Sequence, residues 1–124
     1  MNLKQFEKQQ YINIETFRKN GQGVKTPVWF AQDGNALVIW TQDDSGKAKR
    51  IRNNEKVRVA PSTDSGEPVG EWVEAQARVD ESGEAVSYTA KLFKQKYGFM
   101  FNVFAMLGKL RKAKYTAIKV GAKP

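Results

Sequence analysis

Apolar and polar residues alternate along several short stretches of the chain, and turn-forming residues separate these stretches. Residues 11–18 (YINIETFR) alternate over most of their length, which predicts a half-buried strand. Residues 24–31 (VKTPVWFA) predict a second strand, joined to the first by the glycine-containing turn 19–23, and 36–41 (ALVIWT) predict a third. We therefore expect a three-stranded meander, with Pro27 at an edge or a bulge because proline has no N–H to donate to a neighbouring strand.

The second half of the chain predicts three further strands. Strict alternation predicts strands at 56–60 (KVRVA) and 71–80 (EWVEAQARVD), and 115–120 (YTAIKV) predicts the last one. In the first of these, Val57 and Val59 are expected to point inward.

Four helices are also expected. They are a short one at 3–7, one that Asp44 or Ser45 caps and that ends at 53–55, and two more at 84–96 and 99–112. Six strands at short spacing, mostly joined by turns, predict a mainly β fold: a small, closed or nearly closed antiparallel barrel with flanking helices. The length of 124 residues is that of a single domain spanning 1–124.

The amino-acid composition excludes several classes of enzyme mechanism. The chain has no cysteine and no histidine, which excludes thiolate and histidine metal sites, cysteine nucleophiles and serine–histidine catalysis. We expect no metal site, and the sequence does not identify a catalytic acid or base. Binding, carboxylate or lysine chemistry, and reactions carried by a bound organic cofactor remain.

The charge is distributed unevenly. Residues 1–87 carry 12 basic and 13 acidic groups, whereas 88–124 carry nine basic groups and no acidic one. Such an excess indicates an anionic partner, which is a nucleic acid, a membrane surface or a phosphorylated ligand; a solvated basic face is the alternative.

Residues 97–110 (YGFMFNVFAMLGKL) are apolar around most of a helix circumference, so more than one side of this helix needs to be covered. The barrel together with a partner subunit or a substrate lid is the expected cover. A membrane-surface role, assisted by Arg111, Lys112 and Lys114, is the alternative. The stretch is shorter than the ~20 residues of a spanning helix, so no stable membrane insertion is expected. The polar start of the chain (MNLKQFEKQQ) predicts a cytoplasmic protein.

The segment 41–52 (TQDDSGKAKRIR) contains a candidate phosphate site. It leaves a strand, turns at Ser45-Gly46 and enters a helix, whose first N–H groups and dipole favour an anion. Ser45 offers a hydroxyl and Gly46 allows close approach. Lys47 and Arg50, three residues apart, share one helix face and carry the positive charge.

Five segments in order resemble a known family. They are Thr16-Phe17-Arg18-Lys19-Asn20-Gly21, Thr26-Pro27-Val28-Trp29, Thr41 with Ser45-Gly46-Lys47-Ala48-Lys49-Arg50-Ile51-Arg52, Val59-Ala60-Pro61, and Trp72-Val73-Glu74-Ala75. This pattern resembles the split β-barrel flavin and deazaflavin oxidoreductases related to pyridoxamine 5′-phosphate oxidase, and within them the F420-dependent subgroup. The resemblance covers about residues 11–80, and 88–124 add little to it. It implies a six-stranded split barrel of the FMN-binding type.

The resemblance also implies roles for individual residues. Ser45, Lys47 and Arg50 would bind the cofactor phosphate next to Gly46. The strand with Thr26, Pro27, Val28 and Trp29 would run along the flavin or deazaflavin ring, and Thr41 would end the strand that supports the same site. The family is usually dimeric, so Pro61 and Trp72 would contribute from the partner chain. For the three tryptophans (Trp29, Trp40 and Trp72), packing in the core or an interface is the alternative.

These expectations combine into a cytoplasmic homodimeric oxidoreductase that binds F420, or alternatively FMN, and transfers hydride to or from a small unsaturated or conjugated organic substrate. F420 is favoured because Lys49, Arg52 and the basic segment after residue 87 suit its oligoglutamate tail. One alternative is a flavin- or deazaflavin-binding protein without turnover. The other is a basic barrel that binds single-stranded nucleic acid; the aromatic residues argue against it because they do not alternate with lysine or arginine on one strand face, so we expect no nucleic-acid partner.

Overall fold

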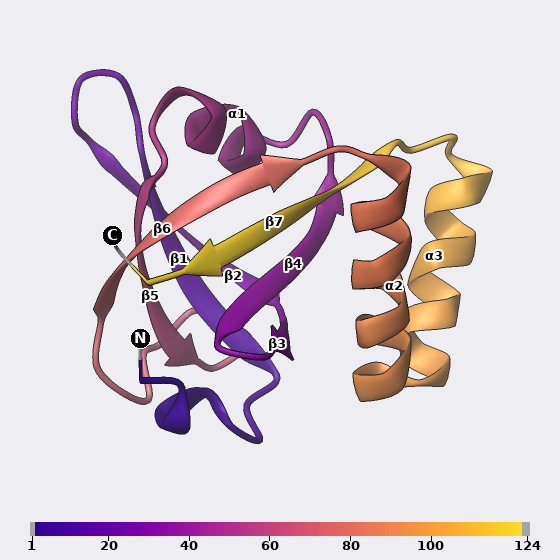
Figure 1. Ribbon diagram of the computed structural model, residues 1–124, viewed down its shortest axis with the longest axis horizontal. Helices are drawn as coiled ribbons and strands as arrows, with labels where there is room; N and C mark the ends of the chain where they lie inside the picture. Colours follow the sequence, from indigo (N-terminus) through magenta and orange to yellow (C-terminus); the bar gives the residue numbers. More distant parts are fainter. Residues whose placement is uncertain (1, 123–124) are drawn as a thin grey trace.

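The computed structural model describes residues 2–122, and within them seven antiparallel strands form one curled sheet (Figure 1). The strand order is β2-β1-β5-β6-β7-β4-β3. The strands are β1 (Tyr11–Phe17), β2 (Gly23–Trp29), β3 (Ala31–Asp33), β4 (Ala36–Gln42), β5 (Lys56–Ser62), β6 (Val73–Asp80) and β7 (Tyr115–Gly121). The mainly β, split-barrel fold predicted from the sequence is confirmed, with seven strands in place of six.

The additional strand arises where one strand was predicted for residues 24–31. Phe30 interrupts that segment and separates β2 from β3. Its backbone N–H donates to the Tyr97 hydroxyl (3.1 Å) and its carbonyl accepts from Lys96 Nζ (2.8 Å), so neither group is available for a strand ladder. The predicted hairpin of the first two strands is confirmed, because β1 pairs with β2. The continuous three-stranded meander is wrong: within residues 2–122, β4 pairs with β3 and β7 and not with β2. Pro27 does lie on an edge strand, as expected.

The barrel interior is filled by the inward side chains of the long strands. Val57 and Val59 are fully buried there, as predicted. The short 3₁₀ helix η1 (Lys4–Phe6) adds Phe6 to this core, and α1 (Gly46–Asn53) adds Ala48 and Ile51. Figure 1 shows η1 and α1 at opposite ends of the barrel.

Strand β1 is buried on both faces and not half-buried as its alternation indicated. Its outward residues Asn13 and Glu15 are covered because other segments pack over them. Asn13 Nδ2 donates to the Gly66 carbonyl at 2.8 Å, and Glu15 Oε1 pairs with Arg58 Nη1 at 2.9 Å. The polar residues of this strand therefore form buried polar contacts and do not face solvent.

Two helices pack beside the barrel on the side of β3, β4 and β7 (Figure 1). They are α2 (Gly83–Tyr97) and α3 (Phe99–Leu110), so the second ends two residues earlier than predicted. Gly98 joins them with a φ of 60°, a conformation that glycine adopts easily. A second apolar cluster, formed by Ala31, Val38, Phe93 and Phe101, lies between sheet and helices. No helix within residues 2–122 has the length and apolar character needed to cross a membrane.

Candidate functional site

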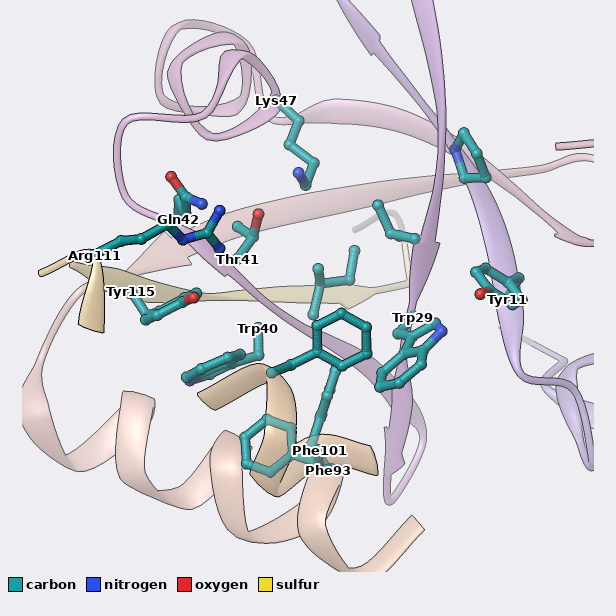
Figure 2. Close-up of a pocket in the computed structure, with 14 residues that line it drawn as sticks. Tyr11, Trp29, Trp40, Thr41, Gln42, Lys47, Phe93, Phe101, Arg111 and Tyr115 are labelled. Atoms are coloured by element: carbon teal, nitrogen blue, oxygen red, sulfur yellow. The ribbon is translucent and has the colours of Figure 1, made fainter. Parts of the chain in front are cut away.

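A cavity of about 360 Å³ opens where β2 and β4 approach each other and meet the helix pair (Figure 2). Its lining comes from four strands, α1 and the helix pair with the turn that follows it. The lining residues are Tyr11, Pro27, Val28, Trp29, Ile39, Trp40, Thr41, Gln42, Lys47, Phe93, Phe101, Phe104, Arg111 and Tyr115. Aromatic side chains dominate this lining, and no carboxylate is among the described residues that form it.

Two stacked aromatic pairs fix the walls of the cavity. Trp29 stacks on Tyr97 with ring centroids 4.3 Å apart and planes within 12°, and Trp40 stacks on Tyr115 at 3.7 Å and 9°. Phe104 contacts the Trp29 ring edge to face at 4.9 Å. Because each ring is held by another ring, these walls are rigid surfaces against which a flat ligand can lie.

Tyr115 keeps its place because α3 has a glycine opposite it. A Cβ atom added at Gly108 would lie 2.7 Å from two carbon atoms of the Tyr115 ring and closer still to its hydroxyl oxygen. Gly108 is buried. The helix therefore approaches the Trp40–Tyr115 stack more closely than any residue with a side chain permits.

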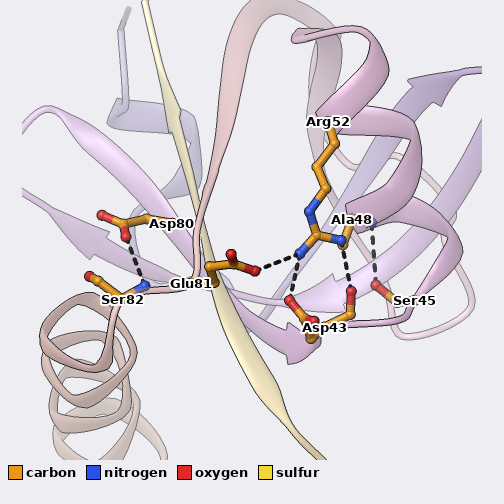
Figure 3. Close-up of polar contacts among 7 residues, drawn as sticks. All are labelled: Asp43, Ser45, Ala48, Arg52, Asp80, Glu81 and Ser82. Atoms are coloured by element: carbon orange, nitrogen blue, oxygen red, sulfur yellow. Dashed lines mark hydrogen bonds and ion pairs between the residues drawn. The ribbon is translucent and has the colours of Figure 1, made fainter.

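Helix α1 delivers a positive charge to the cavity. Ser45 caps the helix, since its side chain accepts a hydrogen bond from the Ala48 N–H at 3.3 Å, which confirms one of the two predicted caps (Figure 3). Lys47 projects from the first turn toward the cavity (Figure 2). Burial, and then the nearby charge of Arg50, lowers the pKa of Lys47 from its usual value. An anion bound beside it would relieve both effects.

Arg50 is anchored against the barrel and folds back over the start of α1. Its Nε donates to Oγ1 of the buried Thr16 at 2.6 Å. Its Nη1 would be only 2.8 Å from a Cβ at position 46, so Gly46 makes room for this guanidinium. Burial, and then the charge of Arg18, lowers the pKa of Arg50. Within residues 2–122, Arg18, Lys47 and Arg50 form no ion pair with a carboxylate, which leaves three neighbouring cations uncompensated.

The other basic residues of α1 differ in whether a carboxylate already compensates their charge. Arg52 pairs with Asp43 at 2.5 Å and with Glu81 at 3.5 Å, so its charge is already compensated (Figure 3). Lys49 is exposed on the same helix and has no carboxylate partner among the described residues. A second hollow of about 400 Å³ shares Gln42 and Arg111 with the cavity. It is otherwise lined by Asp44, Lys112, Ala113 and Lys114.

The structure brings most of the predicted site residues together. Pro27, Val28, Trp29, Thr41 and Lys47 line the cavity. Ser45, Gly46 and Arg50 flank it through the first turns of α1, and Thr26 lies half-buried on β2 beside Pro27.

Pro61 and Trp72 do not line the cavity of their own chain. Pro61 is buried in β5, where it faces Ile12 of β1. Trp72 lies under two cations, Lys25 at 5.2 Å and Arg58 at 5.1 Å from its ring centroid. A contribution of either residue from a partner chain stays a prediction.

Sequence reasoning missed half of the cavity. The residues it did not assign are Tyr11, Ile39, Gln42, Phe93, Phe101, Phe104, Arg111 and Tyr115. For Trp40, core packing and cofactor binding were both left open. Five of these eight lie on α2, on α3, in the turn after α3 or on β7, where the resemblance gave little support. The concentration of aromatic residues in 93–104 was the available signal, because aromatic side chains beside a basic loop are typical of a pocket for a flat anionic ligand.

Comparison with known proteins identifies relatives of the whole described chain. A sequence model of the pyridoxamine 5′-phosphate oxidase family matches residues 2–122. No curated protein sequence is significantly similar. In residues 2–122, no cluster of histidine, cysteine, aspartate or glutamate side chains is suited to hold a metal ion.

Several solved structures share the fold. The heme storage protein HutZ from Vibrio cholerae has 12% sequence identity and a TM-score of 0.72, over 100% of this chain and 92% of that one. A protein described as an F420 reductase has 18% identity and a TM-score of 0.63, over 98% and 93% of the two chains. A protein described as a domain-swapped dimer has 16% identity and a TM-score of 0.63, over 90% and 79%. At these identities the likeness shows the fold.

Proposed function

Because the chain belongs to the pyridoxamine 5′-phosphate oxidase family, we propose that it is an oxidoreductase whose cavity holds F420 or, alternatively, FMN. Members of this family bind flavins or deazaflavins; they include oxidoreductases and also proteins without catalytic activity, such as heme storage proteins. The proposed enzyme acts in the cytoplasm as one cofactor-binding domain. Its substrate is a small unsaturated or conjugated organic molecule.

The observation that carries this proposal is the group of uncompensated cations at the start of α1. Arg50 is repelled by the charges of both Lys47 and Arg18, and no carboxylate within residues 2–122 pairs with any of the three. A bound anion stabilises clustered cations that have no counter-ion. A phosphate also accepts hydrogen bonds from the free N–H groups of the first helical turn. The donor set therefore fits the phosphate of either cofactor.

The aromatic walls fit the ring system of the same ligand. Trp29 and Trp40 lie on strands at opposite sides of the cavity, and each is held by a stacked tyrosine. When bound, a flavin or deazaflavin supplies the hydride-transfer chemistry. The chain would hold the phosphate with Lys47 and Arg50, orient the ring against Trp29, and exclude water with the apolar side chains of α3.

The cations available to an F420 tail differ from those inferred from the sequence. Arg52 is paired with Asp43 and Glu81, so it is not free to bind a further anion. Arg111, Lys112 and Lys114 line the hollow that adjoins the cavity, and Lys49 is exposed. We propose that these four side chains favour F420, because FMN has no carboxylates to reach them.

We also propose a homodimer in which Pro61 and Trp72 approach the cavity of the partner chain. The description of one similar structure as a domain-swapped dimer supports association in this fold. Sedimentation equilibrium at micromolar concentration tests it, and a monomer would contradict the shared site.

The experiment for cofactor binding is a fluorescence titration with FMN and with F420. Lys47→Ala and Arg50→Ala should each weaken the tighter-binding cofactor by about 1.5–3 kcal/mol, which is roughly 10- to 150-fold in Kd. Lys49→Ala is the matched control, since it removes an exposed cation from the same helix, and it should leave FMN affinity within about twofold. Equal affinity in wild type, Lys47→Ala and Arg50→Ala would refute the phosphate site.

A turnover assay separates an enzyme from a protein that only binds the cofactor. The protein loaded with reduced cofactor should reoxidise it faster when unsaturated carbonyl, quinone or nitroaromatic compounds are added. Tight binding without acceleration by any of these acceptors would favour the non-catalytic alternative.

A further inference from the structure

A buried hydroxyl group on β7 has no hydrogen-bond partner. Thr116 has an exposed fraction of 0%, and its Oγ1 forms no hydrogen bond with any residue in 2–122. Such a group gives up its hydrogen bonds to water on folding and regains none, which lowers the free energy of unfolding. Because most buried side-chain polar atoms in folded proteins are hydrogen-bonded, this exception needs a physical reason.

Two other buried polar atoms of the described chain lack a partner, but they differ from the Thr116 hydroxyl. They are Asn13 Oδ1 and Trp40 Nε1. The Asn13 amide already donates through Nδ2 to a backbone carbonyl, and the Trp40 ring is held by contacts with Phe101 and Tyr115. The Thr116 hydroxyl, in contrast, turns by rotation about one bond and can both donate and accept.

The strand register places Thr116 directly opposite Thr41 of β4. The neighbouring pair on the same face is Ile39 and Ile118, and both of these are fully buried in the barrel core. Since alternate residues of a strand share a face, both threonine side chains point into the barrel. Cβ atoms of residues in such a pair lie ~4.5–5.5 Å apart, so rotation about the Cα–Cβ bonds is enough to join the two hydroxyls.

Thr41 connects this buried hydroxyl to the cavity. Thr41 and Lys47 both line the cavity, and Figure 2 shows them on the side away from Phe93 and Phe101. The two are held close to each other because α1 begins shortly after β4 ends. An anionic group bound at Lys47 therefore presents acceptor oxygens to the Thr41 hydroxyl.

We propose that Thr116 is a positioning residue for this anionic group. The Thr41 hydroxyl donates to an oxygen of the group at Lys47, and the Thr116 hydroxyl donates to Thr41 Oγ1. A hydroxyl has one proton and two acceptor lone pairs, so Thr41 can form both bonds at once. The second bond fixes the Thr41 rotamer and polarises its O–H, and it gives Thr116 the partner that it lacks in this structure. This inference rests on the proposed function, in which the anionic group is the phosphate of F420 or FMN.

The variant Thr116→Val should change stability and cofactor affinity in opposite directions. Valine has nearly the shape of threonine and carries no hydroxyl. Without cofactor, the Tm should rise by about 3 °C or more, because no unpaired hydroxyl stays buried. The Kd for the tighter-binding cofactor should rise by about five- to tenfold, because the Thr41 hydroxyl is no longer positioned. A residue that serves only packing would leave this Kd unchanged.

Fluorescence titration of the full chain with FMN and with F420 measures these Kd values. Thr116→Ser keeps the hydroxyl, so it should retain the wild-type Kd within about twofold. In a Thr41→Val background, Thr116→Val should have no further effect on Kd, because the hydroxyl that it positions is absent. Thr89→Val is the matched control: Thr89 is a buried threonine of α2 outside the cavity lining, and its replacement should leave Kd within about twofold.

The outcomes separate this proposal from the proposed function. If the wild type binds a cofactor and Thr116→Val binds it equally tightly, the positioning role is refuted and the cofactor site stands. A Tm that falls in Thr116→Val would show that the hydroxyl already has a partner, and weak binding by Thr116→Ser would show that packing decides; each result overturns the proposal. A wild-type protein that binds neither cofactor would overturn both.

Discussion

The contact between Gly108 and Tyr115 makes a quantitative prediction for the variant Gly108→Ala. The new methyl group would lie 2.7 Å from two carbon atoms of the Tyr115 ring, well inside van der Waals contact. Tyr115 is stacked on Trp40 with centroids 3.7 Å apart, so displacing one ring disturbs the other. Relief of the overlap therefore requires α3 to move away from the sheet.

Two opposing effects set the size of the change. Overpacking of a buried position costs about 3 kcal/mol when neither partner can yield. Alanine is better than glycine in a helix by about 1 kcal/mol. The free energy of unfolding should therefore fall by about 2 kcal/mol. With an unfolding entropy of about 0.26 kcal/mol/K for a chain of this length, the Tm should fall by about 8 °C.

Thermal unfolding followed by circular dichroism measures this shift. Gly83→Ala is the matched control: Gly83 begins α2 with no atom within 4 Å of its added Cβ, so the change should stay within about 0.5 kcal/mol. In a Tyr115→Ala background, Gly108→Ala should become neutral or stabilising, because the obstacle is gone. A Gly108→Ala protein that is as stable as the wild type would refute the proposed close contact.

Three further predictions concern single side chains. Gly46→Ala should displace the Arg50 guanidinium and weaken binding of the proposed cofactor by about three- to tenfold in a fluorescence titration, with little change in Tm; unchanged affinity would argue against Arg50 as a phosphate ligand. Glu15→Gln should lower the free energy of unfolding in urea by about 1 kcal/mol, because Arg58 loses its partner while staying partly exposed, and an unchanged midpoint would show that the pair contributes nothing. Since the pKa of Lys47 is lowered, raising the pH should neutralise this side chain before ordinary lysines and weaken phosphate binding; Lys47→Arg should remove this pH dependence, and a wild-type profile flat up to pH ~10 would contradict it.

Local patterns predicted most elements of this fold but not how they are connected in space. Alternation located β1, β5 and β6, and two further short segments of strand-forming residues located β4 and β7, because these signals lie within each segment. The interruption at Phe30 was not predictable in this way, because it depends on the hydrogen bonds of the Phe30 backbone with Lys96 and Tyr97 at the end of α2. The partner of β4 was missed for the same reason: it is decided by β7, far along the chain.

In the candidate site, too, relations within one helix were predictable and contacts between distant segments were not. The spacing of Lys47 and Arg50 predicted that both would lie near the start of α1, because that relation is local to one helix. The fate of their neighbour Arg52 was not predictable, since one of its two carboxylate partners, Glu81, lies beyond β6. Gly46 had been expected to admit a ligand, and in the structure it admits the Arg50 guanidinium.

The place of β7 in the sheet has a consequence for how the protein is made. β7 lies between β6 and β4, and Leu37 pairs with Val120. During synthesis β4 therefore leaves the ribosome long before its principal partner exists, and the barrel closes only after residues 115–121 have emerged. Such distant pairing is slow to form, so the nascent chain exposes the edge of β4 until residues 115–121 have emerged.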